Sequence, residues 1–517
     1  MKNIIPLIAV CSFALLYGCA SKSISHNPLQ AIPANNALPY RMVAGEILDI
    51  SGPQLAVGKS TPFNWGYSLI DSTGISIQWK GKINTTNLPF ARFRLSTATD
   101  VRESCVLEVK LAKDNTTLGQ LDISYATYLQ VYEIILPQGS LQKLLKQGVT
   151  IRQIKSKQPA GIFTGSDIRI PEIFRPHLLL YNKATPGLDD VKRTILYGNV
   201  YQPFGWMEGV VMDGLQVLSA NEPISNASLQ SRFGQYFDSA SFSYTGLFNT
   251  LVSNRVMNVE TILPFALYAR YHPAHPSLEK AIEFCIQHKD ASGVISDDPK
   301  AAYPVIKTEE CYTVSYPLAV IGQQRGQQEL NDLAVKNLLA RATALANSSG
   351  IYQRTNNKGG REYRNWSRGV AWYLLGFIRS WEQLKTHPDA DKIKAEIIRA
   401  ATYVIQFQNQ DGMWYCFMHE PETGVETSGT AGIAAALMYA HQLGILDDKA
   451  AGAADKATAG LLHFLTPDGL LTGTAQVNKG GEALQRSGYR VISPYTLGFF
   501  GYLLNGSEIK KKQLIQR

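Results

Sequence analysis

Between about residue 40 and residue 180, hydrophobic and polar residues alternate along several short stretches. Residues 75–79 read Ile-Ser-Ile-Gln-Trp, and residues 107–111 read Leu-Glu-Val-Lys-Leu. A period of two predicts strands with one buried face. Turn sequences such as Asp-Ser-Thr-Gly at 71–74 separate these stretches, which favours antiparallel pairing. We therefore predict a β-sandwich domain over residues 40–185 and expect it to be a structural module, with carbohydrate contact as the alternative.

The hydrophobic period changes near residue 185, and from there to about residue 504 it is helical. Helices are predicted at Val256–Tyr271, Ser277–His288, Thr308–Gln324, Glu329–Asn347, Ser367–Leu384, Asp391–Asn409, Thr427–Leu443 and Ala450–Leu465. Helices joined by short loops pack as antiparallel neighbours, and a long series of them either extends as a solenoid or closes on itself. The loops lack a fixed repeat length and are rich in aromatic residues, which favours a closed toroid over residues 186–508 with its site on the loops at one end.

The first residues have the pattern of an export signal. Lys2 precedes an apolar run from Ile4 to Leu16, and Leu-Tyr-Gly-Cys at 16–19 is a cleavage site of the lipobox type. The run is too short to span a bilayer. We predict a lipoprotein signal peptide over residues 1–18, lipidation of Cys19, a tether to residue 39 and attachment to a bacterial outer membrane. An ordinary secretory signal is the alternative.

Composition and charge narrow the classes of function. The 517 residues are 45% hydrophobic, with 50 Lys and Arg against 42 Asp and Glu, as expected of a folded protein. The basic residues are scattered, which argues against a nucleic-acid partner, while a net charge of +8 would suit an anionic saccharide. The cysteines beyond the signal are widely spaced and indicate neither a metal site nor disulfides; Cys105 and Cys285 are predicted to be buried.

Three motifs at helix starts and ends carry the candidate chemistry. Residues 366–372 read Trp-Ser-Arg-Gly-Val-Ala-Trp, residues 408–414 Gln-Asn-Gln-Asp-Gly-Met-Trp, and residues 426–431 Glu-Thr-Ser-Gly-Thr-Ala. The flat faces of sugar rings pack on indole, and Arg binds a carboxylate with two parallel hydrogen bonds. Trp366, Arg368, Trp372 and Trp414 are therefore candidates for binding an acidic sugar, although packing alone also explains each motif singly.

In this order and spacing, the three motifs resemble those of the unsaturated glucuronyl and rhamnogalacturonyl hydrolases of glycoside hydrolase families 88 and 105, and of the related exo-β-glucuronidases of family 154. The resemblance covers about residues 200–505. It implies an (α/α)6 toroid of six helical hairpins, no metal or organic cofactor, and a pocket for a uronic acid at the non-reducing end of an oligosaccharide. The expected activity is that of an exo-acting glycoside hydrolase.

Glycoside hydrolysis needs a proton donor and usually a second carboxylate. The segment from Thr308 to Pro317 resembles the family stretch that holds a catalytic Asp seven residues before a Pro, and counting back reaches Glu310. This chain thus has Glu where the unsaturated-uronate hydrolases have Asp. Glu309 is adjacent, and the choice between the two stays open. Glu260, charged within an apolar segment, is the expected partner, with an ion pair to Arg255 as the alternative.

Four further residues are candidates for contacts with the sugar. Arg486, Tyr489 and Arg490 lie on the loop before the last helix and are candidates for the uronate carboxylate, and His419 follows Trp414. Each is equally explained as an exposed loop residue. Asp213, on an earlier helix, is a further carboxylate candidate.

Two other functions fit the same pattern. A polysaccharide lyase on this toroid would abstract a proton next to a uronate carboxyl with Tyr312, Tyr363 or His419. A glycan-binding lipoprotein without turnover would need only the aromatic loops. The chain has no phosphate loop, serine-hydrolase elbow or zinc-peptidase motif, which argues against those enzyme classes. The sequence leaves open whether the uronate is saturated or 4,5-unsaturated.

Overall fold

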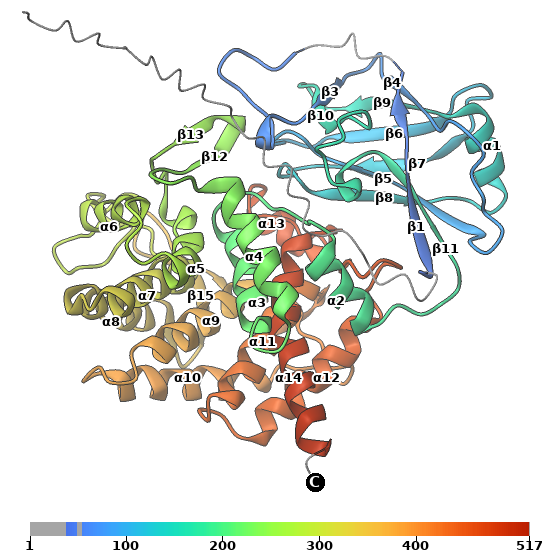
Figure 1. The fold of residues 1–517 in the computed structure, drawn as a ribbon. Coiled ribbons are helices and arrows are strands. Elements are labelled where there is room, and N and C mark those ends of the chain that lie inside the picture. Colours follow the sequence, from blue (N-terminus) through green and yellow to red (C-terminus); the bar gives the residue numbers. More distant parts are fainter. Residues whose placement is uncertain (1–37, 49–53, 516–517) are drawn as a thin grey trace, which may run out of the picture.

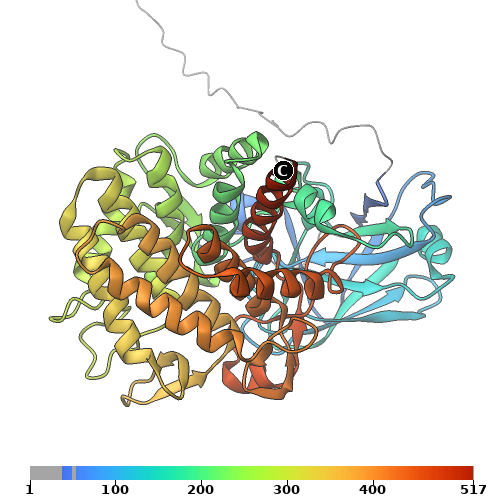
Figure 2. The same ribbon diagram turned by 90° about the horizontal axis from the view of Figure 1, so that it is seen from below.

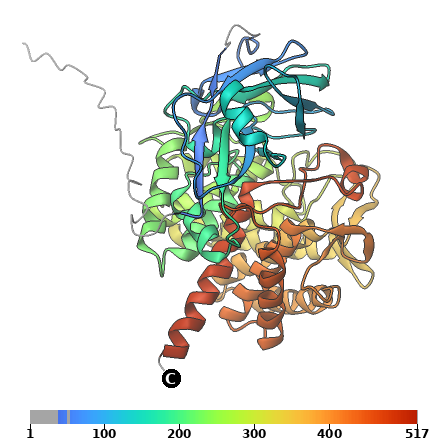
Figure 3. The same cartoon turned by 90° about the vertical axis from the view of Figure 1, so that its right-hand side faces the viewer.

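The computed structural model describes residues 38–48 and 54–515. A β-rich part, which we call the β-region (residues 40–181), covers one end of a larger part built mainly of helices, the helical region (residues 188–515), as Figure 1 and Figure 3 show. The predicted signal peptide, Cys19 and most of the tether lie outside the described residues. No helix in the described part of the chain is long and apolar enough to cross a membrane.

The β-region contains two antiparallel sheets and a smaller two-stranded one. The first has the order β1-β11-β5-β8, the second β2-β4-β9-β6-β7, and β10 pairs with β3. The elements are β1 (Tyr40–Ala44), β2 (Glu46–Ile47), β3 (Tyr67–Ile70), β4 (Ile75–Gln78), β5 (Phe90–Ser96), β6 (Val106–Leu111), β7 (Thr117–Asp122), β8 (Val131–Ile135), α1 (Ser140–Gln147), β9 (Val149–Lys155), β10 (Ala160–Phe163) and β11 (His177–Tyr181).

The alternating stretches form strands as predicted. Leu107, Val109 and Leu111 of β6 are buried, and so are Ile75 and Ile77 of β4. They share one hydrophobic core with residues of the other sheet, among them Phe93 and Leu178. The period-two pattern therefore marks the face of each sheet that turns toward this core.

The helical region contains antiparallel helix pairs joined by loops and short hairpins. Its helices are α2 (Leu188–Tyr197), α3 (Trp206–Leu218), α4 (Pro223–Tyr236), α5 (Leu263–Tyr271), α6 (Ser277–Gln287), α7 (Tyr316–Arg325), α8 (Gln328–Leu345), α9 (Ser367–Gln383), α10 (Ala390–Ile405), α11 (Thr427–Gln442), α12 (Asp448–Leu462), α13 (Gly481–Arg486) and α14 (Leu497–Ile515). Its strands are β12 (Ser243–Thr245), β13 (Leu251–Ser253), β14 (Ala346–Asn347), β15 (Gly350–Thr355), β16 (Arg361–Arg364), β17 (Tyr415–Phe417), β18 (Glu420–Val425), β19 (Thr474–Ala475) and β20 (Arg490–Val491).

The helices close into a ring, as Figure 2 shows from below. Helix α3 packs on α5, α5 on α7, α7 on α9, α9 on α11, α11 on α14, and α14 packs back on α3. Glycines make the last contact close: a Cβ added to Gly214 of α3 would lie 2.1 Å from the carbonyl oxygen of Gly498 on α14. The chain therefore forms a closed toroid and not an open solenoid, and small residues at the closing seam allow it.

Two of the predicted helices begin differently in the structure. In place of one helix over 256–271, a 3₁₀ turn (Val259–Thr261) precedes α5. In place of one regular helix over 308–324, a π-helical turn (Cys311–Ser315) precedes α7. Both irregular turns lie beside the cavity described below, where a change of helical period alters which side chains face inward.

Buried polar contacts hold the β-region against the helical region. Arg94 of β5 forms two hydrogen bonds to Asp468, at 2.6 and 2.9 Å, and both side chains are fully buried. Asn249, between β12 and β13, donates to the carbonyls of Ser60 and Ala98 and accepts from the amide of Asp100. Such fully paired buried groups fix relative orientation. Loops of the β-region therefore have defined positions over the ring.

Candidate active site

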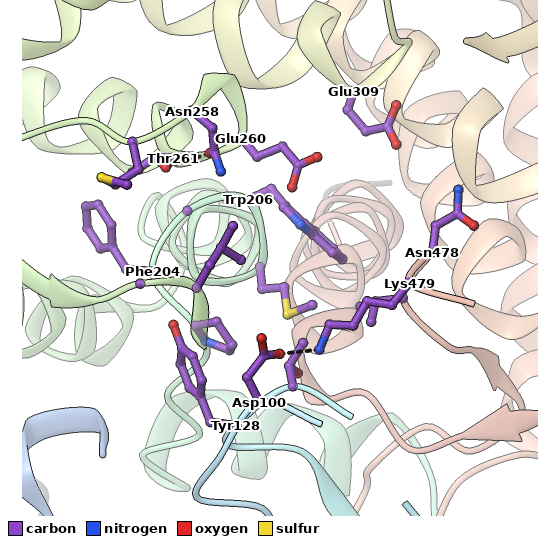
Figure 4. A pocket seen from close by; sticks show the side chains of 18 of the residues that line it. Asp100, Tyr128, Phe204, Trp206, Asn258, Glu260, Thr261, Glu309, Asn478 and Lys479 are labelled. Carbon is purple, nitrogen blue, oxygen red and sulfur yellow. Dashed lines mark hydrogen bonds and ion pairs between the residues drawn. The ribbon is translucent and has the colours of Figure 1, made fainter. Parts of the chain in front are cut away.

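A cavity of about 570 Å³ lies between the β-region and the helical ring. Its lining combines aromatic rings, carboxylates and cations, as Figure 4 shows. The aromatic residues are Tyr128, Phe204, Trp206, Tyr244, Trp366 and Trp372; the charged residues are Asp100, Arg102, Glu260, Asp297, Glu309, Arg368 and Lys479. An apolar surface with a few convergent polar groups is typical of a small-ligand site.

Carboxylates gather at one end of the cavity. Glu260, on the 3₁₀ turn before α5, and Glu309, just before the π-helical turn, both extend into it (Figure 4). The ammonium of Lys307 lies 3.2 Å from Glu260 Oε1 and 3.5 Å from Asp297 Oδ2. The alternative prediction from the sequence was an ion pair between Glu260 and Arg255. In the structure, Glu260 forms its ion pair with Lys307 instead.

Glu309 has the properties of a proton donor. Burial raises the pKa of its carboxyl to about 7, Lys307 opposes that rise and the charge of Glu260 adds to it. The side-chain amide of Gln353 donates to both carboxylate oxygens at 2.8 and 2.9 Å. A carboxyl with a pKa near neutrality, held in place inside a cavity, is suited to general acid catalysis.

Glu310 does not line the cavity. Its side chain is fully buried and lies 2.7 Å from the guanidinium of Arg341, which is also fully buried. It also accepts a hydrogen bond from the amide of Lys307 at 2.9 Å. Burial raises the pKa of Glu310, and Arg341 opposes the rise. This side chain joins α8 to the segment before α7, which is a structural role.

A π-helical turn separates the two glutamates from Pro317. Residues 311–315 form this turn, and a π turn contains one residue more than an α-helical turn. Positions before it are therefore rotated relative to a regular helix that ends at the same Pro. With this turn in place, Glu309 lines the cavity, and Glu310, the residue that the count from Pro317 reaches, does not.

Two of the predicted tryptophans form part of the cavity floor. Trp366 and Trp372 are almost fully buried and line the cavity. Trp206 packs edge-on against Trp372, with the ring centres 5.2 Å apart. Sequence analysis did not select Trp206, although it stands at the start of α3 as Trp366 stands at the start of α9.

Arg368 also lines the cavity, but its terminal nitrogens are already occupied. They donate to the carbonyls of Ala475 and Gln476 at 2.6 and 2.7 Å, and the guanidinium lies over the ring of Trp366. Arg368 therefore holds β19 and the loop after it, and this loop brings Asn478 and Lys479 to the cavity. This geometry indicates that Arg368 positions the loop and has no pair of free terminal nitrogens with which to bind a carboxylate.

The β-region forms one wall of the cavity, which the sequence analysis did not expect. Asp100 pairs with Lys479 across the two regions, and Lys479 also donates to the carbonyl of Ala126 at 2.7 Å. Tyr128 lines the same wall, and its hydroxyl donates to the carbonyl of Thr245. The β-region is thus a component of the site and more than a structural module.

The remaining candidates lie outside the cavity lining. Trp414 is buried and donates to the carbonyl of Val404. His419 contacts Glu420 at 3.1 Å, and Arg486 forms ion pairs with Glu420 and Glu482. Tyr489 donates to the carbonyl of Asp122 at 2.6 Å, and Arg490 to that of Thr423 at 2.8 Å. Each of these side chains is thus engaged by other groups of the protein outside the cavity.

The lyase candidates and Asp213 are also engaged elsewhere. Asp213 is buried and accepts hydrogen bonds from Tyr312, Tyr316 and Tyr502, while Arg379 donates to it at 2.6 Å. Burial alone would raise the pKa of Asp213, but Arg379 and these hydroxyls hold it below the usual range. The hydroxyl of Tyr363 donates to Asn478 at 3.0 Å. Neither Tyr312 nor Tyr363 lines the cavity.

The cysteines and acidic groups give no further site. Cys105, Cys285, Cys311 and Cys416 are buried and unpaired, which confirms the predicted burial of the first two. Within residues 38–48 and 54–515, no cluster of three or more His, Cys, Asp or Glu side chains has the arrangement of a metal site.

The fold and the cavity together define a closed helical toroid with an aromatic and acidic cavity against the β-region. Residues 315–511 match the model of glycosyl hydrolase family 88. The unsaturated rhamnogalacturonyl hydrolase YesR of Bacillus subtilis (strain 168) is 26% identical over 156 residues, which are 29% of this chain and 43% of YesR. The match therefore spans less than half of that curated relative.

Solved structures share the toroid. One from Klebsiella pneumoniae, described as a "possible member of GH105 family", has a TM-score of 0.55 at 16% identity and covers 66% of this chain and 98% of its own. Another, described as a polysaccharide lyase, has a TM-score of 0.51 at 17% identity and covers 64% and 98%. At this identity the likeness establishes the fold alone. The predicted resemblance of the chain to glycoside hydrolases of families 88 and 105 is confirmed.

Proposed function

We propose that this protein is an exo-acting glycoside hydrolase that removes a terminal uronic acid, saturated or 4,5-unsaturated, from polysaccharide-derived oligosaccharides. The observation that carries the proposal is that two carboxylic residues, Glu309 and Glu260, line one cavity whose floor contains tryptophans. The similarity to family 88 supports a glycosidic substrate. The predicted β-sandwich and (α/α)6 topology form part of the same proposal.

Glu309 is the proton donor in this proposal. Its carboxyl, with a pKa of about 7, is protonated in a large fraction of molecules at neutral pH and can protonate either a glycosidic oxygen or the ring double bond of an unsaturated uronate. Glu260, which lies 3.2 Å from the ammonium of Lys307, is placed to accept a proton from the attacking water. Trp206, Trp366 and Trp372 give the sugar ring an apolar surface.

The positions of the lyase candidates weaken that alternative. Tyr312 donates to Asp213 beneath the floor, and Tyr363 and His419 lie outside the cavity lining. A glycan-binding protein without turnover would not need a carboxyl with a pKa near 7 beside a second carboxylate. Both alternatives become outcomes of the experiment below.

The experiment compares two oligosaccharides that differ only in a saturated or a 4,5-unsaturated terminal uronate. Release from the unsaturated one, with loss of enol-ether absorbance, supports action on the double bond. Release from the saturated one alone supports a glucuronidase. Glu309→Gln should lower either activity by about 10² to 10⁴. A rise in absorbance with polymer would overturn the proposal in favour of a lyase, and binding without any product would favour the non-catalytic protein.

We also propose that Cys19 carries a lipid anchor that attaches the protein to a bacterial outer membrane. The lipobox at residues 16–19 supports this proposal. Cells that express the full chain with a metabolic fatty-acid label should yield labelled protein in the outer-membrane fraction. Cys19→Ala should lose the label, and a label that persists in Cys19→Ala would contradict the proposal.

A further inference from the structure

Arg102 is an immobilised guanidinium at the rim of the cavity. It belongs to the β-region, and its Nε donates to Asp100 Oδ2 at 2.8 Å. Its guanidinium carbon lies 4.1 Å from the ring centre of Phe248, on the loop between β12 and β13. Stacking and the Nε hydrogen bond hold the plane of the group in place. The Arg side chain is nevertheless 38% exposed.

The terminal nitrogens of Arg102 are available to a ligand. In the described part of the chain, the only hydrogen bond that Arg102 donates from its side chain comes from Nε. Arg recognises carboxylate and sulfate through its terminal nitrogens, and a guanidinium that is already ordered loses little entropy when it binds. Arg102 differs in this respect from Arg368, whose terminal nitrogens are occupied by backbone carbonyls.

The charges around Arg102 are not balanced. Asp100 is almost buried, and its two oxygens contact Lys479 and Arg102. One carboxylate thus faces two cations, which leaves a net charge of +1 on this wall. Figure 4 shows Asp100 and Lys479 across the cavity from Glu260 and Glu309. An anionic group on the ligand would neutralise the remaining positive charge of the wall that the β-region forms.

The rim around Arg102 is built jointly by both regions. Phe248 is 56% exposed, and the neighbouring Asn249 has φ 58°, in the left-handed region that Asn tolerates better than most residues. Asn249 uses both ends of its amide to hold residues 98 and 100. This contact fixes the loop that carries Arg102, so the rim is preorganised before a ligand arrives.

We propose that Arg102 binds a sulfate or carboxylate on the second sugar of the substrate, so that the β-region selects oligosaccharides that are acidic next to the terminal uronate. The exposure of Arg102 and Phe248 places them at the mouth, where the leaving part of the substrate lies when the terminal sugar occupies the floor. The inference rests on the proposed hydrolase activity. It adds a specificity residue from outside the helical ring.

The test uses unsaturated glucuronyl-N-acetylgalactosamine without sulfate and with a 4-sulfate or 6-sulfate, and measures kcat/KM and Kd for each. We expect at least one sulfated disaccharide to be preferred about 10- to 100-fold, the range expected of a charge-assisted hydrogen bond pair. Arg102→Gln should remove that preference by lowering kcat/KM on the preferred sulfated disaccharide more than on the unsulfated one, and Arg102→Lys should restore part of it.

Arg152→Gln is the matched control, because Arg152 is an exposed Arg of the β-region that pairs with Glu108 and does not line the cavity. It should leave all constants unchanged. Turnover of the unsulfated substrate with no preference for sulfate, or an equal loss on all substrates in Arg102→Gln, would overturn the role of Arg102 and leave the hydrolase proposal intact. Failure to bind or turn over any of the three disaccharides would overturn the role of Arg102, and failure on their saturated counterparts as well would overturn both proposals.

Discussion

Replacement of Glu309 and Glu310 one at a time with Gln should separate catalysis from stability. Both residues are adjacent in sequence, but Glu309 lines the cavity and Glu310 forms a fully buried pair with Arg341 at 2.7 Å. Glu309→Gln removes the proposed proton donor from a site where burial destabilises the charged form of the carboxyl group. We expect kcat/KM to fall by about 10² to 10⁴ with little change in the melting temperature Tm.

Glu310→Gln should have the opposite effect. It leaves the guanidinium of Arg341 buried without its anionic partner, a change that costs about 3–5 kcal/mol. At about 1.5 °C per kcal/mol for a region of this size, Tm should fall by roughly 4–8 °C. At temperatures where the variant stays folded, kcat/KM should remain within about tenfold of the original value, because Glu310 does not face the cavity.

The assay is thermal unfolding followed by circular dichroism, together with kcat/KM at 20 °C. Glu310→Gln combined with Arg341→Gln provides the control, because removal of both charges avoids an unpaired buried cation and should recover part of the lost stability. An unchanged Tm with lost activity in Glu310→Gln, and full activity in Glu309→Gln, would refute the assignment and return the catalytic role to Glu310.

Two further predictions concern pH and the contact between the regions. Because only protonated Glu309 can donate, and its pKa is about 7 in the protein without ligand, kcat/KM should fall about tenfold for each pH unit well above 7. Lys307→Met should move this alkaline limb of kcat/KM to higher pH, since Lys307 lowers the pKa of Glu309, and an unmoved limb would contradict the assignment. Asp468→Asn should lower the unfolding free energy by about 3 kcal/mol, because it leaves Arg94 buried with one carboxylate fewer, and an unchanged unfolding curve would show that this pair does not hold the two regions together.

Local patterns predicted the elements and the helical part of the site. The period of two marked the buried faces of β4 and β6, and helices such as α6 and α9 begin and end within about a residue of their predicted bounds. The segment at residues 366–372 identified Trp366 and Trp372, which line the cavity. These features depend on neighbours in sequence, so periodicity and motif spacing contain the information.

Features that depend on helical register were not predictable in the same way. The choice between Glu309 and Glu310 depends on the π-helical turn at Cys311–Ser315. Nothing in the apolar pattern of that segment distinguishes a turn of this kind from a regular α-helical turn. A glycine makes the turn fit, since a Cβ on Gly376 of α9 would lie 2.3 Å from the carbonyl carbon of Cys311. This close approach is a contact between distant segments, which the sequence does not reveal.

The wall formed by the β-region was missed for a related reason. Asp100 and Lys479 are 379 positions apart, and each stands in a loop whose local sequence resembles any other polar loop. Arg486, Tyr489 and Arg490 were selected because they precede the last helix, yet the cation that reaches the cavity is Lys479. The sequence shows which residues belong to this loop. Which of their side chains reaches the cavity depends on how the loop is held, here by Arg368.

The distribution of charge in the cavity limits how an acidic sugar can bind. Glu260 and Asp297 surround a single cation, Lys307, so this end has a net charge of −1 even when Glu309 is protonated. A uronate carboxylate placed there would be repelled and would raise the pKa of Glu309 further. The opposite wall, with Lys479 and Arg102 around Asp100, has a net charge of +1. Electrostatics therefore favours a pose in which the acidic groups of the substrate point toward the β-region and the bond to be cleaved lies near Glu309.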